Sequence, residues 1–267
     1  MKRAVFYHHL LAAAKQTNLS KEEIFQKASQ LGYQGVECDH LDLGEDPAAF
    51  ADLLHSFGLQ IASVFCGLDF PKGISDAWLR NLLERIHTAG CRKLLAVPNK
   101  IPSGETEQDT QLICAGLNRL CSLATEYEID VSVEDFDSVL SPCCSPEKLQ
   151  NLFERVPELK FTLDTGNFMY LDRDILECIP ALLPRITHMH LKDRSLSPIL
   201  PGGSPQKSAG GTDMFDAPVG CGDIPMAQVI QIAKNQGFDG WCSAEFFSAP
   251  DMLYFLERSA QWMDQNL

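Results

Sequence analysis

The sequence alternates short apolar runs with segments of helical periodicity, and it does so eight times in 267 residues. The apolar runs begin near residues 4, 35, 61, 94, 130, 160, 186 and 240, and no linker separates the units. Strand and helix units in alternation are typical of α/β proteins with a parallel sheet. Eight units in a chain of this length predict a (β/α)8 TIM barrel, a single domain over residues 1–267. A doubly wound open sheet is the alternative, but the first strand lacks the glycine-rich turn of a dinucleotide-binding fold.

Several helix starts carry their own signals. Ser20 is followed three residues later by Glu23, which is the pattern of a capping box. We therefore expect the first helix to begin there. Asp46-Pro47 and Ser145-Pro146 each combine an N-cap residue with a proline in the first turn.

Residues 195–220 interrupt the alternation. The segment is rich in glycine and proline and is far longer than most connections in compact domains. It is predicted to be a long loop after the seventh strand. Loops of this length often serve as lids or binding loops, and a disordered segment is the alternative.

The charge balance argues against a nucleic-acid partner. The chain has 36 Asp and Glu against 22 Lys and Arg, a formal net charge of −14. Proteins that grip a phosphate backbone normally present a basic face. A membrane partner is not expected either, because no run of eighteen apolar residues occurs.

Ten cysteines occur without any CxxC pair, and several of them lie within apolar runs. They are interpreted as small buried hydrophobic residues in a reducing compartment. The apolar stretch after the first residues is too short for a signal peptide. The expected location is therefore the cytoplasm.

An acid or a histidine closes each of the last four apolar runs: Glu134, Asp164, His190 and Glu245. A buried carboxylate or imidazole is costly unless a partner compensates it. In a barrel the C-terminal ends of the strands meet at one face, which holds the active site. The topology is therefore expected to bring these four side chains together.

Three carboxylates and one imidazole form a ligand set for one divalent metal ion. Such a set suits Mn²⁺, Mg²⁺ or Co²⁺, and Zn²⁺ is also compatible with it. The three negative charges favour a neutral substrate over a polyanion. Each residue also has a structural interpretation: Glu134 in a buried salt bridge, Asp164 capping the turn at Gly166, His190 in the core and Glu245 as a structural acid.

The second half of the chain also carries two longer motifs. These are His188-Met189-His190-Leu191-Lys192-Asp193 and Val219-Gly220-Cys221-Gly222-Asp223-Ile224. Together with the Asp164-Thr165-Gly166 turn and the terminal Ala244-Glu245, they resemble the xylose isomerase-like TIM barrels. This superfamily includes sugar isomerases and epimerases, hydroxypyruvate isomerase, inosose dehydratase and endonuclease IV. The resemblance covers essentially the whole chain, although its motifs are weak in the first half.

The resemblance implies that Glu134, Asp164, His190 and Glu245 bind one metal ion and that Glu134 and Glu245 form an acid–base pair. A metal ion can polarise a ketose carbonyl and stabilise the enediolate that forms when the α proton leaves. Return of the proton on the opposite face is epimerisation. Its return to the neighbouring carbon is aldose–ketose isomerisation. A metal-dependent isomerase or epimerase with a small carbohydrate substrate is the expected function.

Four residues are predicted to contact the substrate: Asn167, Arg194, Glu37 and His8. Asn167 stands where the family commonly has a histidine, and this departure leaves the substrate open. Glu37 is as well explained by a salt bridge. His188 lies two residues before His190 on the same face of a strand and is interpreted as a core residue.

Three other functions stay open. The same enolate chemistry serves a dehydratase of the inosose type. A metal-dependent DNA endonuclease fits less well, because no histidine follows the third or fourth strand and the chain is acidic. A non-catalytic sugar-binding barrel is the last alternative. Barrels of this kind are often dimers or tetramers, and the sequence leaves the oligomeric state open.

Overall fold

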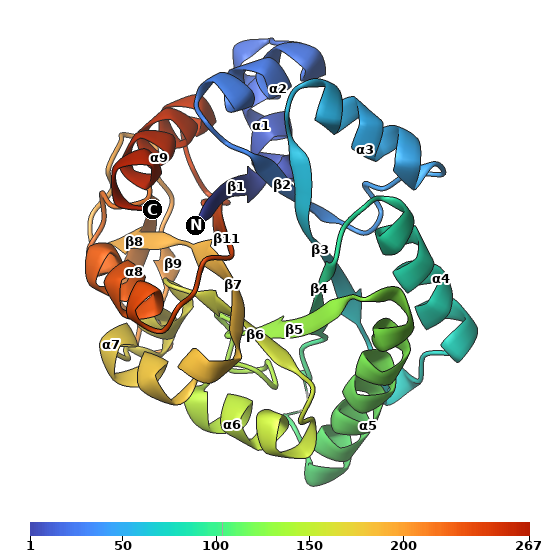
Figure 1. The fold of residues 1–267 in the computed structure, drawn as a ribbon. Helices are drawn as coiled ribbons and strands as arrows, with labels where there is room; N and C mark the ends of the chain where they lie inside the picture. Colours follow the sequence, from blue (N-terminus) through green and yellow to red (C-terminus); the bar gives the residue numbers. More distant parts are fainter. Residues whose placement is uncertain (103) are drawn as a thin grey trace.

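Eight parallel strands close into a barrel in the order β1, β2, β3, β4, β5, β6, β7 and β11 in the computed structural model, which describes residues 1–102 and 104–267. The α-helices lie around the outside of this barrel (Figure 1). The TIM barrel predicted from the alternation of strands and helices is confirmed. The C-terminal ends of the strands therefore converge on one face, as the site prediction requires.

The barrel strands are β1 (Lys2–Phe6), β2 (Gly35–Asp39), β3 (Gln60–Leu68), β4 (Lys93–Pro98), β5 (Asp130–Glu134), β6 (Lys160–Asp164), β7 (Ile186–Leu191) and β11 (Trp241–Ala244). The α-helices are α1 (Tyr7–Thr17), α2 (Lys21–Gln30), α3 (Pro47–Ser56), α4 (Asp76–Thr88), α5 (Glu107–Ala124), α6 (Pro146–Arg155), α7 (Ile175–Cys178), α8 (Met226–Asn235) and α9 (Met252–Asn266). Within the described ranges, no helix is long and apolar enough to cross a membrane.

The predicted helix caps form. The Ser20 side chain accepts a hydrogen bond from the Glu23 amide at 3.1 Å, and the Glu23 carboxylate accepts one from the Ser20 amide at 2.7 Å. The side chains of Asp46 and Ser145 cap α3 and α6 in the same way. These caps satisfy amide groups that have no partner inside the helix.

Helix α1 has no counterpart among the sequence predictions. It follows β1 directly, and its cap residue Phe6 makes no side-chain capping bond. The helix is instead held by burial of Leu10, Ala13 and Ala14. A helix that begins without a polar cap gives no start signal in the sequence, so the first helix was expected only at Ser20.

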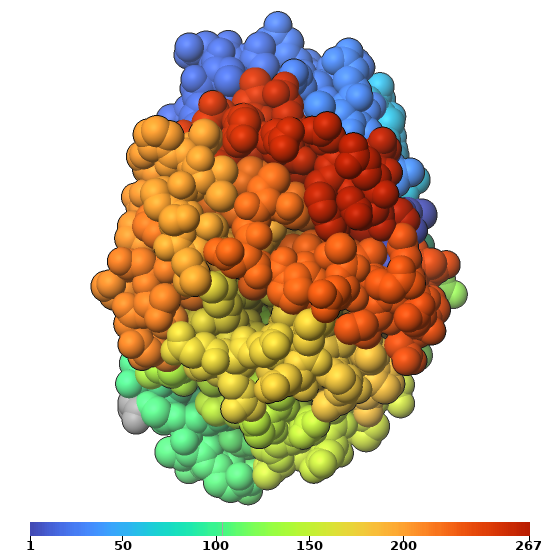
Figure 2. All heavy atoms as spheres, turned by 90° about the vertical axis from the view of Figure 1, so that its left-hand side faces the viewer, coloured from blue at the N-terminus to red at the C-terminus, as the bar shows by residue number. Residues whose placement is uncertain are grey.

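The segment expected to be a long loop contains short strands. β8 (Asp193–Ser195), β10 (Asp213–Ala217) and β9 (Gln206–Lys207) form an antiparallel sheet in the order β8, β10, β9. Figure 2 shows the molecule from the side, and this segment, in light orange, lies at the left-hand end of the barrel. Backbone pairing of this kind needs no strong apolar pattern, which explains why the sequence predicts only a loop.

Asp193 holds the turn that follows this sheet. Its buried carboxylate accepts hydrogen bonds from the amides of Gly220 at 2.8 Å, Gly222 at 2.9 Å and Ile224 at 3.3 Å. A Cβ atom at Gly222 would lie 2.3 Å from the Asp193 Oδ1 atom, so only glycine fits. Burial raises the pKa of Asp193 to about 6, against the effect of the three amides. The Val219–Ile224 motif is therefore a turn held by hydrogen bonds to the first residue of β8.

We predict that Asp193→Ala destabilises the fold by about 3 kcal/mol, because three amide donors lose their acceptor in a buried place. Thermal unfolding measures the change. Asp213→Ala is the matched control, since Asp213 pairs with Lys207 on the exposed part of the same small sheet. The control should keep a Tm close to that of the unaltered protein. An equal loss in both variants would contradict the fastening role of Asp193.

Candidate active site

The structure brings together the four side chains that close the last apolar runs. Glu134 ends β5, Asp164 ends β6, His190 lies near the end of β7, and Glu245 directly follows β11. Parallel register aligns Asp164 with His190. One ligand atom from each of the four lies within 4.8 Å of the others. The cluster is a product of the closed barrel, because its members are separated by up to 111 residues.

His190 is at the centre of the cluster. Its Nδ1 atom lies 3.1 Å from an oxygen of Glu134 and 3.1 Å from an oxygen of Glu245. Its Nε2 atom lies 3.1 Å from a carboxylate oxygen of Glu37. Ionised carboxylates only accept hydrogen bonds, so a lone pair on Nδ1 would face two further acceptors. A cation, either a proton or a metal ion, is required between Nδ1 and the two glutamates.

Asp164 has one engaged and one free oxygen. Its Oδ1 atom accepts hydrogen bonds from the amides of Gly166 at 2.8 Å and Asn167 at 2.9 Å. Its Oδ2 atom is buried and has no hydrogen-bond partner. The turn-capping interpretation of Asp164 is therefore correct for one oxygen, and the other accepts no hydrogen bond and lies 3.5 Å from the Lys192 ammonium group.

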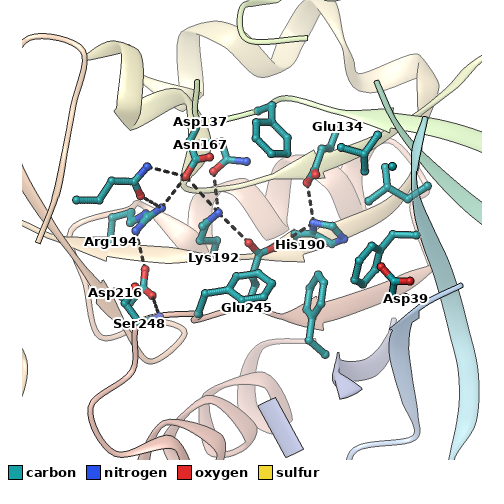
Figure 3. Close-up of a pocket in the computed structure, with 18 residues that line it drawn as sticks. Asp39, Glu134, Asp137, Asn167, His190, Lys192, Arg194, Asp216, Glu245 and Ser248 are labelled. Atoms are coloured by element: carbon teal, nitrogen blue, oxygen red, sulfur yellow. Dashed lines mark hydrogen bonds and ion pairs between the residues drawn. The ribbon is translucent and has the colours of Figure 1, made fainter. Parts of the chain in front are cut away.

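Lys192 enters the cluster from the strand that carries His190. Its ammonium nitrogen lies 2.8 Å from Glu245, 3.5 Å from Asp164 and 3.7 Å from Asp137. It also donates a hydrogen bond to the Asn167 side-chain oxygen at 2.9 Å. Figure 3 shows Lys192 between Asn167 and Glu245, beside the His190 ring. The sequence analysis names Lys192 only as part of the His188–Asp193 motif, because nothing in the linear pattern reveals which carboxylates face it.

Arg194 connects the barrel to the small sheet above it. Its guanidinium group contacts Asp216 at 2.6 Å, Asp137 at 3.1 Å and Gln206 at 2.8 Å. The second oxygen of Asp216 accepts a hydrogen bond from the Ser248 amide at 2.6 Å. Sequence analysis missed Asp137, Gln206 and Asp216 as site residues. Gln206 and Asp216 lie in the irregular segment, whereas Asp137 follows β5 closely enough to have been found.

The pKa directions reflect the crowding of acids. Burial raises the pKa of Glu134 and of Asp164, although His190 and Lys192 act in the opposite direction. Burial also acts to raise the pKa of Glu245, but Lys192 and His190 together hold it well below the usual range. The ionised forms of these carboxyl groups therefore depend on nearby cations.

These residues open into a cavity of about 400 Å³, a volume that suits a small molecule. The apolar side chains that line it are Phe6, Phe65, Leu95, Val97, Phe136 and Phe247. The polar side chains that line it are Asp39, Glu134, Asp137, Asn167, His190, Lys192, Arg194, Gln206, Asp216, Glu245 and Ser248. His190 is the only histidine among the described lining residues. A site for several histidine-bound ions is not indicated there.

Two of the four residues predicted to contact substrate line this cavity, namely Asn167 and Arg194. Glu37 is fully buried deeper in the barrel, between His188 and His190. The salt-bridge interpretation of Glu37 is the one that its geometry matches. His8 is on α1, where its ring lies 3.5 Å from Asp42.

The residues present fit one divalent cation. Glu134, Asp164 and Glu245 carry three negative charges, and the Lys192 ammonium group balances one of them. A divalent ion would balance the other two. The Asp164 Oδ2 atom lies 3.5 Å from the Lys192 ammonium group, and the Glu245 Oε2 atom lies 3.1 Å from His190 Nδ1. These two oxygens and the Nδ1 atom are ligand atoms of the types that Mn²⁺ and Mg²⁺ accept.

Comparison with known proteins places the chain among barrels of one kind. Residues 25–266 match the family described as xylose isomerase-like TIM barrel. Among solved structures, the probable 3-DHS dehydratase AsbF from Bacillus anthracis is 18% identical with a TM-score of 0.76, and the match covers 99% of each chain. A D-allulose 3-epimerase from Methylomonas sp. is 15% identical with a TM-score of 0.73, over 100% of this chain and 98% of that one.

The matches to curated relatives cover a smaller share of each chain. The inosose dehydratase of Geobacillus kaustophilus is 24% identical over 194 residues, which is 65% of this chain and 62% of the relative. The inosose dehydratase of Mesomycoplasma hyopneumoniae strain 7448 is 26% identical, over 66% of this chain and 63% of the relative. The matches thus span less than two thirds of the length of these relatives.

We predict that the purified protein binds one Mn²⁺ per chain and that Asp164→Asn weakens this binding by about 10-fold or more. Asparagine keeps an oxygen for the Gly166 and Asn167 amides but removes the charge of the free oxygen. Calorimetric titration of chelator-treated protein gives the stoichiometry and the affinity. Added Mn²⁺ should also raise the Tm of the unaltered protein, because a ligand that binds the native state stabilises it.

Glu154→Gln on the exposed face of α6 is the control for loss of one negative charge, and it should bind as the unaltered protein does. Absence of binding in the unaltered protein would contradict the metal site. Three ions per chain would favour the endonuclease alternative.

Proposed function

Because the chain belongs to the xylose isomerase-like TIM barrel family, we propose that it is a metal-dependent enzyme that enolises a small polyhydroxy ketone. The favoured outcome is epimerisation or aldose–ketose isomerisation. The observation that carries the proposal is the convergence of Glu134 and Glu245 on one histidine nitrogen, each at 3.1 Å. Both carboxylates line the cavity in which a substrate would lie.

Two carboxylates in one cavity supply the two proton transfers that such a reaction needs. One glutamate accepts the proton from the carbon next to the carbonyl, and the C–H electron pair becomes the C=C bond of an enediolate. The other glutamate returns a proton, either to the opposite face of that carbon or to its neighbour. A divalent ion held by Glu134, Asp164, His190 and Glu245 supplies the charge that polarises the carbonyl and stabilises the enediolate.

The charge of the cavity supports a neutral substrate. Its cationic side chains, Lys192 and Arg194, are each already paired with carboxylates. A phosphate group would therefore find acidic neighbours rather than a free cation. The aromatic and aliphatic lining residues suit the C–H faces of a sugar or cyclic polyol, and the polar lining residues suit its hydroxyl groups.

Dehydration is the second candidate, and the position of Lys192 favours it. An ammonium group 2.8 Å from Glu245 could donate a proton to a leaving hydroxyl group after enolisation. Water would then leave and an unsaturated ketone would form. The relatives named as inosose dehydratases support this outcome as well.

We predict that Mn²⁺-loaded protein exchanges the α proton of a substrate ketone with solvent deuterium and that Glu245→Gln abolishes this exchange. A glutamine cannot accept the proton, whereas its size preserves the site. Proton NMR in deuterated buffer measures the exchange for a panel of ketohexoses and cyclic polyhydroxy ketones. Glu154→Gln should retain full exchange. Exchange that persists in folded Glu245→Gln would rule out Glu245 as a base in this reaction.

The identity of the product separates the two candidates. An isomer of equal mass supports epimerisation or isomerisation, and an ultraviolet-absorbing product that has lost water supports dehydration. If dehydration occurs, Lys192→Met should lower product formation by about 100-fold while α-proton exchange continues. Dehydration at an unchanged rate in that variant would remove Lys192 as the proton donor.

A further inference from the structure

Beneath the metal-ligand cluster lies a second buried group that the proposed reaction does not use. Glu37 on β2 is 0% exposed, and its Oε2 atom is surrounded by three polar atoms. These are His188 Nε2 at 2.9 Å, His190 Nε2 at 3.1 Å and the Ser243 hydroxyl, which donates a hydrogen bond at 2.8 Å. His188 Nε2 also lies 2.8 Å from the Ser243 hydroxyl oxygen. The three atoms come from β7 and β11, so one carboxylate oxygen joins three strands of the barrel.

The two nitrogens of the His190 ring face different partners. Nε2 faces the single oxygen of Glu37, and Nδ1 faces Glu134 and Glu245. An ionised carboxylate only accepts hydrogen bonds, so Glu37 requires a proton on Nε2. With a metal ion in the ligand cluster, the neutral ring would carry this proton alone. The Nδ1 lone pair then points into the ligand cluster. The ring is further held by Phe6, whose ring meets it edge-on at 5.0 Å.

A second metal ion between Glu37, His188 and His190 is the alternative, since these residues also offer ligand atoms within 4.8 Å of one another. Two observations argue against it. All three contacts to the Glu37 oxygen have hydrogen-bond lengths, and the Ser243 hydroxyl is one of the donors. A second ion would also require both nitrogens of His190 to lose their protons, with a single carboxylate to balance the charge.

We propose that Glu37 is a positioning residue for the metal centre: it accepts the Nε2 proton of His190 and so fixes Nδ1 as the nitrogen that binds the ion. His188 and Ser243 hold Glu37 in place. A carboxylate behind a histidine ligand orients the ring and raises its basicity, and loss of such a partner typically costs 10- to 100-fold in metal affinity. The inference rests on the proposed metal centre but not on the identity of the reaction.

The test measures Mn²⁺ affinity by calorimetric titration in Glu37→Gln, Glu37→Leu and Ser243→Ala. Glutamine keeps an acceptor oxygen but loses the charge, so we expect a moderate loss of affinity, about 10-fold. Leucine removes the acceptor, so the loss should approach about 100-fold. Ser243→Ala should weaken binding in the same direction and least of the three, because Glu37 itself remains.

Ser132→Ala is the matched control. Ser132 on β5 donates or accepts a buried 2.8 Å hydrogen bond with Thr162, and the variant removes the same atoms from the barrel interior as Ser243→Ala does. It should bind Mn²⁺ with unchanged affinity. Thermal unfolding of the metal-free variants separates a folding defect from a binding defect.

A spectroscopic readout follows the position of the proton directly. In zinc-loaded protein with ¹⁵N-labelled histidine, His190 should show a protonated Nε2 and an unprotonated Nδ1. Glu37→Leu should lose this single pattern, and Glu37→Gln should retain it. Rescue by glutamine is not expected if Glu37 only fills space, because leucine would then serve equally well.

The outcomes are distinct. Graded loss of affinity with the stated NMR pattern supports the inference. Affinity unchanged in folded Glu37→Gln and Glu37→Leu overturns it and leaves the proposed function intact. Two ions in the unaltered protein and one in Glu37→Leu would also overturn it, in favour of a second metal site. No ion in the unaltered protein would remove the metal centre itself, and the inference with it.

Discussion

The accumulation of negative charge at the mouth of the barrel governs the arrangement of this protein. Glu134, Asp164 and Glu245 end neighbouring parts of one closed sheet, so their carboxylates cannot move apart without loss of the fold. Burial removes the water that would otherwise screen them. Cations must stand among them: Lys192 and His190 supply part of that positive charge, and the proposed divalent ion would supply the rest.

The basic side chains of the site come from one continuous stretch of the chain. His188, His190, Lys192 and Arg194 are two residues apart along β7 and β8, so their side chains fall on the same face. Each meets acids at its own depth. His188 contacts Glu37 near the floor, and Arg194 contacts Asp216 at the rim.

Because these basic residues lie at successive depths, the contacts of the site form three layers. The lowest layer holds His190 in one orientation, the middle layer contains the ligand atoms and Lys192, and the upper layer fastens the small β8–β10–β9 sheet over the mouth. The cavity adjoins the middle and the upper layers, because His190, Lys192 and Glu245 line it together with Arg194 and Asp216. We expect the proposed chemistry at the depth of Glu134, His190 and Glu245, where the acid cluster meets the cavity.

The alternation of apolar runs and helical segments was enough to predict the barrel, because the pattern is local and repeats eight times. The same pattern placed Glu134, Asp164, His190 and Glu245 at strand ends, and closure of the barrel then requires them to meet. Polar capping residues, which are also a local signal, predicted where several helices begin. Helix α1 lacked such a signal, and packing alone determines where it begins.

The partners of each charge were decided only by the tertiary structure. No linear pattern shows that Lys192 faces Glu245 rather than solvent, or that Arg194 is paired with Asp216 from the irregular segment. The sequence left Glu37 open between a substrate contact and a salt bridge. The folded barrel puts it against His188 and His190. The sequence by itself determined that Glu134, Asp164, His190 and Glu245 meet at the mouth of the barrel, since their positions at the strand ends follow from strand periodicity. The pairing of their charges depends on distances across the closed sheet, which only the folded chain defines.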